Sequence, residues 1–326
     1  MNVITKEQLI SFKDFIDKHE AFYITGHKEP DGDCLTSSLG VAQIIKKIGK
    51  PYQLLSSGPF KRTEIKKYEN LFSKSCKILH ENRKKIGLII VDCSEFERLG
   101  DYEKELRDLD YFILDHHKTS EFASNNGIIN TKAPATVYII QHIYENLIGK
   151  VDKETAEILF FGLCTDTGFF RFLDETSEDV FLSAARLVKS GANPRQTYAE
   201  ITSGKPFSTR KLLSIMLDRA EQKFDGKLIY TYETLDDTRK YGHEGRDSDS
   251  LYQMLLSVDN VKAVLFIRQD TEKTCTAGFR SKEDIDVSAI AAVFGGGGHK
   301  NAAGLSTTGK ISQLLPKILK EFEKIF

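Results

Sequence analysis

A histidine and two aspartates follow the first short apolar run of the sequence. The run "AFYITG" ends at residue 26, and His27, Asp31 and Asp33 stand just after it, before a segment with helical spacing. A single aspartate behind a strand is most often a helix cap or a turn residue, and a single histidine most often packs or lies at the surface. Each residue alone therefore says little about function, and it is the proximity of the three residues in the sequence that suggests a functional site.

Further acids and histidines follow later apolar runs. The run "IGLIIVD" ends on Asp92, and "YFILD" ends on Asp115, which His116 and His117 follow at once. Asp166 follows a helical stretch from about 153 to 165. Because ligands of parallel α/β sheets gather at the carboxyl ends of the strands, we expect these side chains to converge at one edge.

The side chains of this group match the preferences of hard divalent cations. Mg²⁺ and Mn²⁺ prefer carboxylate oxygens, and Mn²⁺ also accepts imidazole. Clustered carboxylates repel one another in a dry cleft; two cations about 3.5 to 4 Å apart relieve that repulsion, activate a water and neutralise phosphoryl charge. The sequence therefore predicts a two-metal site with the candidate ligands His27, Asp31, Asp33, Asp92, His116 and Asp166.

Alternating strands and helices would position these residues. We expect strands at 21–26, 52–56, 86–92 and 111–115 and a helix from about 35 to 48. Near-continuous apolar strands separated by helices are typical of a parallel sheet that is covered on both faces. The first half of the chain is therefore predicted to be a doubly wound, mostly parallel α/β domain.

The sequence of the second half of the chain predicts helices followed by a smaller strand-rich unit. Helical patterns cover about 177–190, 194–202 and 206–223, and breaks that contain Gly and Pro separate them. Strands are expected in "KLIYTYE", "VKAVLFIRQD" and "TCTAGFRS". We predict a catalytic domain over 1–190, a helical linker over 191–206 and a mixed α/β domain over 207–326.

Composition narrows the class of protein. With 46 Lys and Arg against 47 Asp and Glu, the formal net charge is −1, so there is no global basic field for long nucleic acid. No apolar run approaches the roughly 18 residues of a membrane-spanning helix, and the N-terminal segment reads as a helix, not a signal peptide. The five cysteines show no regular spacing, which favours reduced thiols and a cytoplasmic location.

Five motifs in order resemble the DHH phosphoesterase superfamily, in its two-domain branch with a DHH-associated C-terminal domain. They are "HKEPDGD", "VDCS", the triplet "DHH" at 115–117, "TDTG" and the C-terminal "GGGGHKNAAG". Any one of them would be weak, but together they span about residues 20 to 305 in the order of the family. Two segments depart from the family pattern, "KTSEFASNNG" and "APATVYII", and they concern the approach to the cleft rather than the metal ligands.

The resemblance implies roles for residues of the first domain. The implied ligands are His27, Asp31 and Asp92 for one Mn²⁺ and Asp33, Asp92 and His116 for the other, with Asp166 serving either. Mg²⁺ and Co²⁺ are alternatives to Mn²⁺. Asp115 is expected to orient the neighbouring histidine, and His117 matches a residue that hydrogen-bonds the scissile phosphate.

The C-terminal domain is expected to bind the substrate. Glycines at 295–298 allow close backbone approach and present N–H groups to an anion, although a glycine run alone is more often a turn. Arg98 could equally be an exposed helical residue. The predicted substrate-binding residues are Arg98, Arg268, Arg280, Ser281, Lys282, Gly296, Gly297, Gly298, His299 and Lys300.

The resemblance implies a Mn²⁺-dependent phosphodiesterase or phosphatase that acts on small nucleotides held between the domains. Candidate substrates are cyclic di-AMP, its linear product pApA, short oligoribonucleotides and 3′-phosphoadenosine 5′-phosphate. An inorganic pyrophosphatase-like hydrolase is one alternative, although related pyrophosphatases lack the "GGGGH" element. A nucleotide sensor without catalysis is another, although none of the metal carboxylates is missing. The resemblance is also compatible with a homodimer.

Overall fold

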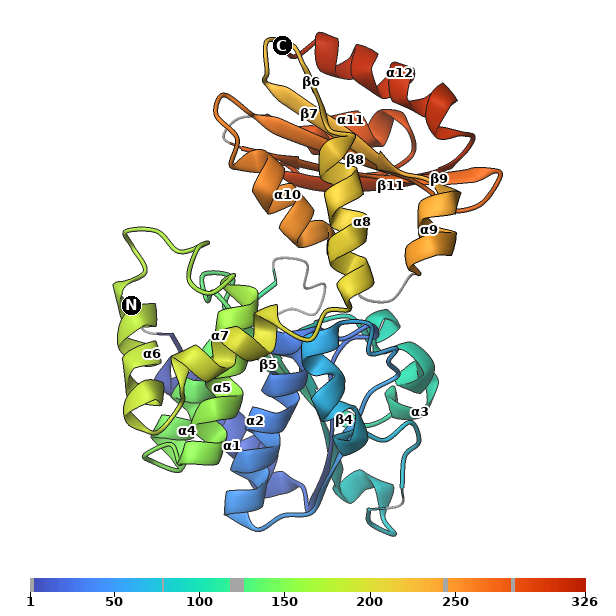
Figure 1. Ribbon diagram of the computed structural model, residues 1–326. Helices are drawn as coiled ribbons and strands as arrows, with labels where there is room; N and C mark the ends of the chain where they lie inside the picture. Colours follow the sequence, from blue (N-terminus) through green and yellow to red (C-terminus); the bar gives the residue numbers. More distant parts are fainter. Residues whose placement is uncertain (1–2, 78, 118–125, 243–245, 283–284) are drawn as a thin grey trace. The chain divides into compact units, whose positions relative to one another are not determined.

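Two sheets organise the chain, each with its own core (Figure 1). The structure, a computed structural model, describes residues 3–77, 79–117, 126–242, 246–282 and 285–326. It divides into two units, Met1–Gly204 and Lys205–Phe326. The segment predicted as a linker contains helix α7 (Pro194–Thr202), which belongs to the first unit.

A five-stranded parallel sheet forms the centre of the first unit. Its strand order is β2-β1-β3-β4-β5, and every neighbouring pair is parallel. The strands are β1 (Ala21–Thr25), β2 (Tyr52–Leu55), β3 (Ile86–Val91), β4 (Asp110–Asp115) and β5 (Gly127–Ile129). The order reverses direction between β1 and β3, and in open α/β sheets the crevice that binds ligands lies at such a point.

Separate cores cover the two faces of this sheet. Ile89 and Val91 of β3 pack with residues of α1, α2, α4 and α5, whereas Leu88 and Ile90 pack with residues of η3 and α3. This alternation along one strand confirms the predicted doubly wound α/β unit. Its further helices are α1 (Lys6–Lys18), α2 (Gly32–Ile48), η1 (Thr63–Leu71), η2 (Arg83–Lys85), η3 (Phe96–Tyr102), α3 (Glu103–Leu106), α4 (Thr136–Leu147), α5 (Lys153–Asp166) and α6 (Glu178–Lys189).

Helix α2 starts at Gly32, earlier than the predicted start near residue 35. Asp31 is its N-cap, because Oδ1 of Asp31 accepts the N–H of Cys34 over 3.1 Å. The helix ends at Ile48, and its C-cap Gly49 has a φ of 82°, a left-handed conformation that glycine adopts without strain. The start of α2 therefore holds Asp31 and Asp33 just beyond the carboxyl end of β1.

A six-stranded mixed sheet forms the centre of the second unit, as predicted. Its order is β10-β11-β9-β8-β7-β6, with β7 and β8 parallel and the other pairs antiparallel. Helices α11 and α12 pack on one face, and α8 and α10 pack on the other. The elements are α8 (Phe207–Asp218), β6 (Glu221–Lys223), β7 (Leu228–Glu233), α9 (Leu235–Tyr241), α10 (Ser248–Leu256), β8 (Ala263–Gln269), β9 (Thr274–Ser281), α11 (Val287–Val293), β10 (Gly297–His299), β11 (Ala302–Thr308) and α12 (Ile311–Glu323).

The segment predicted as one helix over 206–223 is a helix followed by a strand. Helix α8 ends at Asp218, and β6 begins at Glu221 and pairs with β7. The polar residues of β6 fit the surface of a helix equally well, so the pattern alone does not separate the two structures. The strand forms because β7 offers an unpaired edge, which is a tertiary effect.

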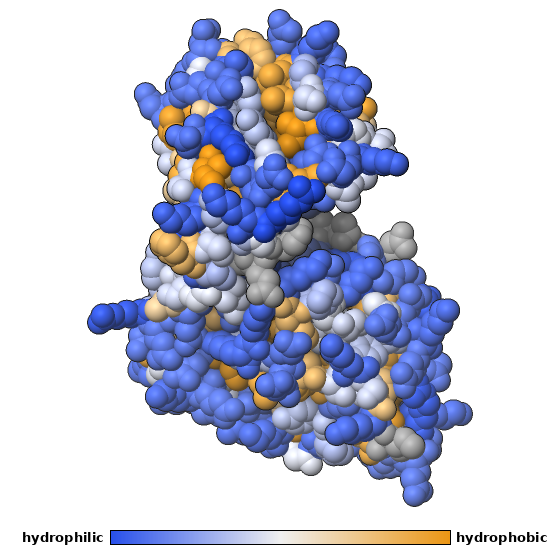
Figure 2. All heavy atoms as spheres, turned by 45° about the vertical axis from the view of Figure 1, so that its right-hand side comes forward, coloured by the Kyte–Doolittle hydropathy of each residue, from blue (hydrophilic) through white to orange (hydrophobic). Residues whose placement is uncertain are grey.

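Of the helices in the described ranges, none combines the length and the apolar character needed to cross a bilayer. Hydrophilic side chains cover most of the visible face of each unit, and apolar side chains form separate patches (Figure 2).

Candidate metal centre

The carboxyl ends of β1, β3 and β4 bring three predicted segments to one edge of the parallel sheet. His27 follows β1, Asp92 follows β3, and Asp115 ends β4 next to His116 and His117. Asp92 has a φ of 59°, which is uncommon for a residue other than glycine. Backbone strain of this kind is frequent at functional sites.

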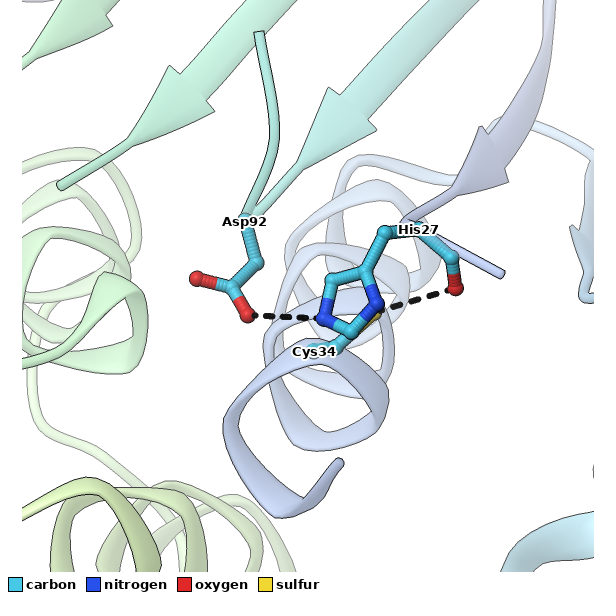
Figure 3. Close-up of side chains that lie close together, drawn as sticks. All are labelled: His27, Cys34 and Asp92. Atoms are coloured by element: carbon cyan, nitrogen blue, oxygen red, sulfur yellow. Dashed lines mark hydrogen bonds and ion pairs between the residues drawn. The ribbon is translucent and has the colours of Figure 1, made fainter. Parts of the chain in front are cut away.

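His27 and Asp92 face each other across the point where the strand order reverses (Figure 3). Nε2 of His27 lies 3.6 Å from Oδ2 of Asp92, and Nδ1 of His27 lies 2.8 Å from the backbone oxygen of Lys28. Because a carbonyl oxygen only accepts, Nδ1 carries the hydrogen, and Nε2 of a neutral ring turns a lone pair toward the carboxylate. Burial acts to lower the pKa of His27, but Asp92, together with Asp31 and the backbone of Lys28, raises it overall. A proton or a cation therefore belongs between the two groups.

Cys34 lies beside this pair and was not predicted as part of the site. Its Sγ falls within 4.8 Å of the ligand atoms of His27 and Asp92, and it donates weakly to the backbone oxygen of His27 over 3.9 Å. Burial raises the pKa of the Cys34 thiol well above its usual range. The sulfur is therefore held as a neutral thiol.

His116 connects Asp92 to a second group of acids. Its Nδ1 lies 3.2 Å from the backbone oxygen of Ala133, so Nε2 again presents the lone pair. That Nε2 lies 3.6 Å from Oδ1 of Asp92 and 3.3 Å from Oδ2 of Asp166. Ligand atoms of Asp33, His116 and Asp166 all lie within 4.8 Å of one another. Asp92 thus turns one oxygen to each histidine, which is the position that a shared ligand requires.

The first turn of α4 fixes two of these carboxylates. Asp33 accepts the N–H groups of Thr136 (2.6 Å) and Val137 (3.0 Å), and α4 has no side-chain cap of its own. Asp33 on α2 therefore caps a different helix. The hydroxyl of Thr136 donates to Oδ1 of Asp92 over 2.9 Å. Thr136 was not predicted as part of the site, and the one signal in the sequence was its place at the start of the helical pattern in "APATVYII".

The aspartates of the site carry an excess of negative charge. Across the described ranges, none of Asp31, Asp33, Asp92 and Asp166 forms an ion pair with Lys or Arg, and the pairs of Asp92 and Asp166 are with histidines. Burial raises the pKa of Asp33 well above its usual value, and the charges of Asp92 and Asp166 add to the effect. Burial also raises the pKa of Asp166 to about 6. Carboxylate oxygens and imidazole nitrogens in this arrangement fit a divalent cation.

Asp31 stands at the margin of this group. Its charge contributes to the raised pKa values of His27, Asp33 and Asp166, so it lies close to them. One of its oxygens caps α2, and it is not part of the groups of three ligand atoms found in the described residues. Its ligand role therefore stays a prediction.

Asp115 and His117 form a pair next to the candidate metal ligands. Asp115 is fully buried, and its Oδ1 lies 2.9 Å from Nδ1 of His117. Nδ1 of His117 also lies 3.7 Å from Oδ1 of Asp92, so His117 forms a further group of candidate ligand atoms with Asp92 and His116. The predicted role of His117 as a phosphate donor stays a prediction. Residues 118–125, which include most of the divergent segment after the triplet, lie outside the described residues.

Arg98 lies in η3, half-buried, near the same edge of the sheet. Its backbone oxygen accepts the N–H of Lys28 over 2.7 Å. The positive charge of Arg98 acts to lower the pKa of His117, so the two side chains are electrostatically coupled. The position is compatible with substrate binding, which stays a prediction.

The predicted residues of β8 and β9 divide between the two faces of the second sheet. Arg280 and Arg268 lie on one face, where Arg280 lies over the ring of Tyr252 at 4.8 Å. Ser281 lies on the other face; its hydroxyl donates to the backbone oxygen of Ile285 over 2.7 Å and accepts from Asn301 over 3.0 Å. The hydroxyl of Ser281 is therefore engaged within the fold.

The glycine run forms an edge hairpin with β11. A Cβ at Gly296 would lie 2.3 Å from the backbone oxygen of Gly304, and one at Gly298 would lie 2.5 Å from that of Ala302. A Cβ at Gly297 would meet nothing within 4 Å. Gly296 and Gly298 thus permit the pairing of β10 with β11, and Gly297 faces open space.

Basic side chains and a histidine flank this hairpin. His299 ends β10, and Lys300 follows it, both exposed. Lys282 follows β9, and its backbone N–H donates to the oxygen of Lys262 over 2.9 Å. The substrate roles of these residues stay predictions.

Family models match both units of the chain. The model of the DHH family, N-terminal domain, matches residues 21–163, which include the whole parallel sheet. The model of the DHHA1 domain matches residues 225–326, from just before β7 to the end of the chain. The two matches stand in the order predicted from the motifs.

Curated relatives extend over most of the chain. The bifunctional oligoribonuclease and PAP phosphatase NrnA of Thermus thermophilus is 28% identical over 304 residues, which are 91% of this chain and 88% of that protein. The cyclic-di-AMP phosphodiesterase PdeA of Listeria monocytogenes is 26% identical over 316 residues, which are 90% of this chain and 46% of that protein. The crystal structure of an exopolyphosphatase-related protein from Bacteroides fragilis superposes with a TM-score of 0.87 at 20% identity and covers 100% of this chain and 99% of its own. That likeness shows a shared fold.

Proposed function

Because the chain belongs to the DHH family, with a DHHA1 domain after the DHH domain, we propose that it is a metal-dependent phosphodiesterase or phosphatase of small nucleotides. One observation carries this proposal. Asp92 stands between His27 and His116 at the edge of the parallel sheet, in a group of buried and half-buried acids that have no Lys or Arg partner within the described ranges. The names of the relatives NrnA and PdeA support the class of substrate.

We infer that two divalent cations, with Mn²⁺ as the leading candidate, bind in this group. His27, Asp31 and Oδ2 of Asp92 would hold one, and Asp33, His116, Asp166 and Oδ1 of Asp92 would hold the other. Bound cations of this kind supply an acidified water and neutralise negative charge on phosphoryl oxygens. The donor set of oxygens and imidazole nitrogens suits Mn²⁺, while Mg²⁺ and Co²⁺ remain alternatives.

The residues around the ligands would keep them oriented. Backbone oxygens hold Nδ1–H of His27 and of His116, so that Nε2 faces the acids in both rings. Asp115 holds His117 through Nδ1 and leaves Nε2 for a substrate. The hydrogen bond to Asp115 raises the pKa of His117, which favours the doubly protonated ring and hence an N–H donor at Nε2. Such a donor would stabilise charge on a phosphoryl oxygen.

The substrates we propose are cyclic di-AMP, pApA, short oligoribonucleotides and 3′-phosphoadenosine 5′-phosphate. Cationic and backbone N–H groups of the second unit supply the contacts expected for their phosphates, with Arg268 and Arg280 on one face of the sheet and Gly297 in the exposed hairpin. The formal net charge of −1 agrees with small substrates held locally.

A hydrolysis panel tests the proposal. The purified chain is incubated with Mn²⁺ and each of the four nucleotides, with inorganic pyrophosphate alongside, and specificity constants are ranked. We expect at least one nucleotide to be cleaved, with loss of cleavage in excess EDTA. Cleavage of pyrophosphate alone would favour the pyrophosphatase-like alternative. Nucleotides that bind in the presence of Mn²⁺ and stay intact would favour a sensor.

A further inference from the structure

Glu233, at the end of β7, is a fully buried carboxylate that holds two arginines. Oε1 of Glu233 accepts from Nη2 of Arg246, and Oε2 accepts from Nε of Arg268 over 2.9 Å. The hydroxyl of Thr238 on α9 closes the group: it donates to Oε1 of Glu233 and accepts from Nη2 of Arg246, both over 2.7 Å. The two arginine side chains are 19% and 21% exposed, so the guanidinium groups lie at the edge of the buried region.

This group has more positive than negative charge. Within the part of the chain that the structure describes, Glu233 is the one carboxylate within ion-pair distance of Arg246 or Arg268. The neighbouring Asp247 is already paired with Lys205 at 2.7 Å and with Arg210 at 2.9 Å. Burial and repulsion by Arg268 lower the pKa of Arg246, although the charge of Glu233 and, more weakly, that of Asp270 act to raise it. Two like charges held together in this way are stabilised when an anion binds.

Donors remain available on both guanidinium groups. Arg268 uses Nε on Glu233, and its two terminal amino groups meet no acceptor among the described residues. Nη2 of Arg246 is engaged by Glu233 and Thr238, and its Nε is buried without an acceptor, so among the described residues Nη1 is the nitrogen of Arg246 that no hydrogen bond uses. The cavity beside Arg246, between α8 and the sheet, measures about 10 Å³, which is at the lower limit for one water molecule. An anion therefore has to approach the arginines from the solvent side.

A purely structural role for the group is the competing interpretation. A buried ion pair usually adds little stability compared with apolar residues of similar volume, because both charges lose their hydration. A single arginine would already neutralise Glu233. The second arginine adds repulsion, and the planar donors of two guanidinium groups match the oxygens of a phosphate.

We propose that Arg246 and Arg268, positioned by Glu233, form a phosphate-binding site in the second unit. The ligand is a phosphate monoester dianion, and it has two sources: a phosphate of the nucleotide that is not cleaved, which rests on the proposed function, or free inorganic phosphate. Arg268 was predicted from the sequence as a substrate contact. Arg246 and Glu233 were not predicted, because no motif marks them.

Binding to the full chain, freed of metal with EDTA so that nothing is hydrolysed, tests the site. Calorimetry would compare pApA with ApA, which lacks the 5′-phosphate, and would measure inorganic phosphate separately. We expect the wild type to bind pApA at least about tenfold more tightly than ApA, a value typical of a charged hydrogen bond. Arg246→Ala and Arg268→Ala should each lose most of this difference.

The control is Arg239→Ala, an exposed guanidinium in the same unit that pairs with Asp236 and Glu272. It should preserve the preference for pApA. Arg246→Lys keeps the charge without the planar donors and should lose part of the preference, and thermal unfolding shows whether each variant is folded.

Equal binding of pApA and ApA, together with phosphate binding that Arg246→Ala removes, would identify free phosphate as the ligand. A wild type with no phosphate-dependent binding would overturn the proposal, as would Arg246→Ala and Arg268→Ala variants that bind all three probes as the wild type does. Failure of Mn²⁺-dependent hydrolysis would contradict the proposed function and would leave phosphate binding measurable.

Discussion

Asp115 and His117 are joined by two hydrogen bonds to one oxygen. Oδ1 of Asp115 accepts from Nδ1 of His117 over 2.9 Å and from the backbone N–H of His117 over 3.1 Å. The hydroxyl of Ser94 donates to the other oxygen, and Asp115 is fully buried. The imidazole is therefore fixed at Nδ1, and Nε2 is the nitrogen that a substrate can meet. Asp115 would act on catalysis through His117, as a positioning residue.

Asp115→Asn tests this relationship. The amide is a weaker acceptor than the carboxylate, so His117 should lose both its orientation and its raised pKa. We expect kcat for pApA to fall roughly tenfold to a hundredfold, the effect typical of removing such a positioning partner, with a smaller change in KM. The alkaline limb of the pH profile should also move to lower pH. Ser94→Ala, which removes a single hydrogen bond to Asp115, is the control and should cost less than about tenfold; an unchanged pH profile in Asp115→Asn would contradict the role.

Asp92→Ala should have the largest effect of any single substitution in the metal centre. It removes the oxygens that face both His27 and His116. We expect kcat to fall by more than about a hundredfold, which is more than the loss of a positioning partner causes. Atomic emission should find less Mn²⁺ per chain than in the wild type. Wild-type metal content in the folded variant would rule out Asp92 as a shared ligand.

The convergence of the candidate metal ligands could be predicted from the sequence because parallel strands end at one edge of a sheet. Asp92 and His116 follow two strands that had clear apolar patterns, and the structure places them 3.6 Å apart. Thr136 and Ser94 were missed, because a hydroxyl donor leaves no periodic pattern in the sequence. The hydrogen bond from Thr136 to Asp92 depends on how the first turn of α4 meets β3, which is a tertiary relationship.

The second unit shows another property that the sequence could not predict, namely which face of the sheet each side chain lies on. Adjacent strand residues must point to opposite faces, and this geometry separates Arg280 from Ser281, although both belong to the motif "FRS". The sequence could not say which face carries the substrate. In the same way, the glycine run was predicted as one surface, whereas contacts with β11 divide it into glycines required for pairing and one that faces open space.

Gly296→Ala and Gly297→Ala together test which glycines of the run are required for the pairing of β10 with β11. A methyl group at Gly296 meets a backbone oxygen of β11 at 2.3 Å, which no side-chain movement can relieve. We expect this variant to lose about 1 to 3 kcal/mol of unfolding free energy, whereas Gly297→Ala should stay within about 0.5 kcal/mol of the wild type. Urea unfolding followed by circular dichroism measures both. Equal loss in the two variants would mean that β10 does not pair as described.

Arg280→Ala should weaken substrate binding more than the chemical step. Arg280 lies over Tyr252 on the same sheet face as Arg268, far in sequence from the metal centre. We expect KM for pApA to rise roughly tenfold, as for loss of a charged hydrogen bond, with kcat changed less. Steady-state kinetics with Mn²⁺ measure both constants. A fall in kcat with KM preserved would instead give Arg280 a role in the chemical step.

The raised pKa values of Asp33 and Asp166 predict how metal and pH act together on stability. Burial raises both values, that of Asp166 to about 6, so the metal-free folded chain binds these protons more tightly than the unfolded chain does. The contribution of Asp166 to stability is therefore present at low pH and is lost as the pH rises from about 4 through 6, and the contribution of Asp33 is lost in the same direction. Mn²⁺ bound in the proposed site would replace the protons, so it should raise Tm by several degrees at pH 7.5 and by clearly less at pH 5, where it competes with them. Calorimetry with EDTA or Mn²⁺ at the two pH values measures this difference.

The variant Asp166→Asn should reduce the difference between the two gains in Tm, and the control Asp101→Asn, at an exposed position, should leave it unchanged. An equal gain in Tm at both pH values would show that the cation does not displace protons from these carboxyls.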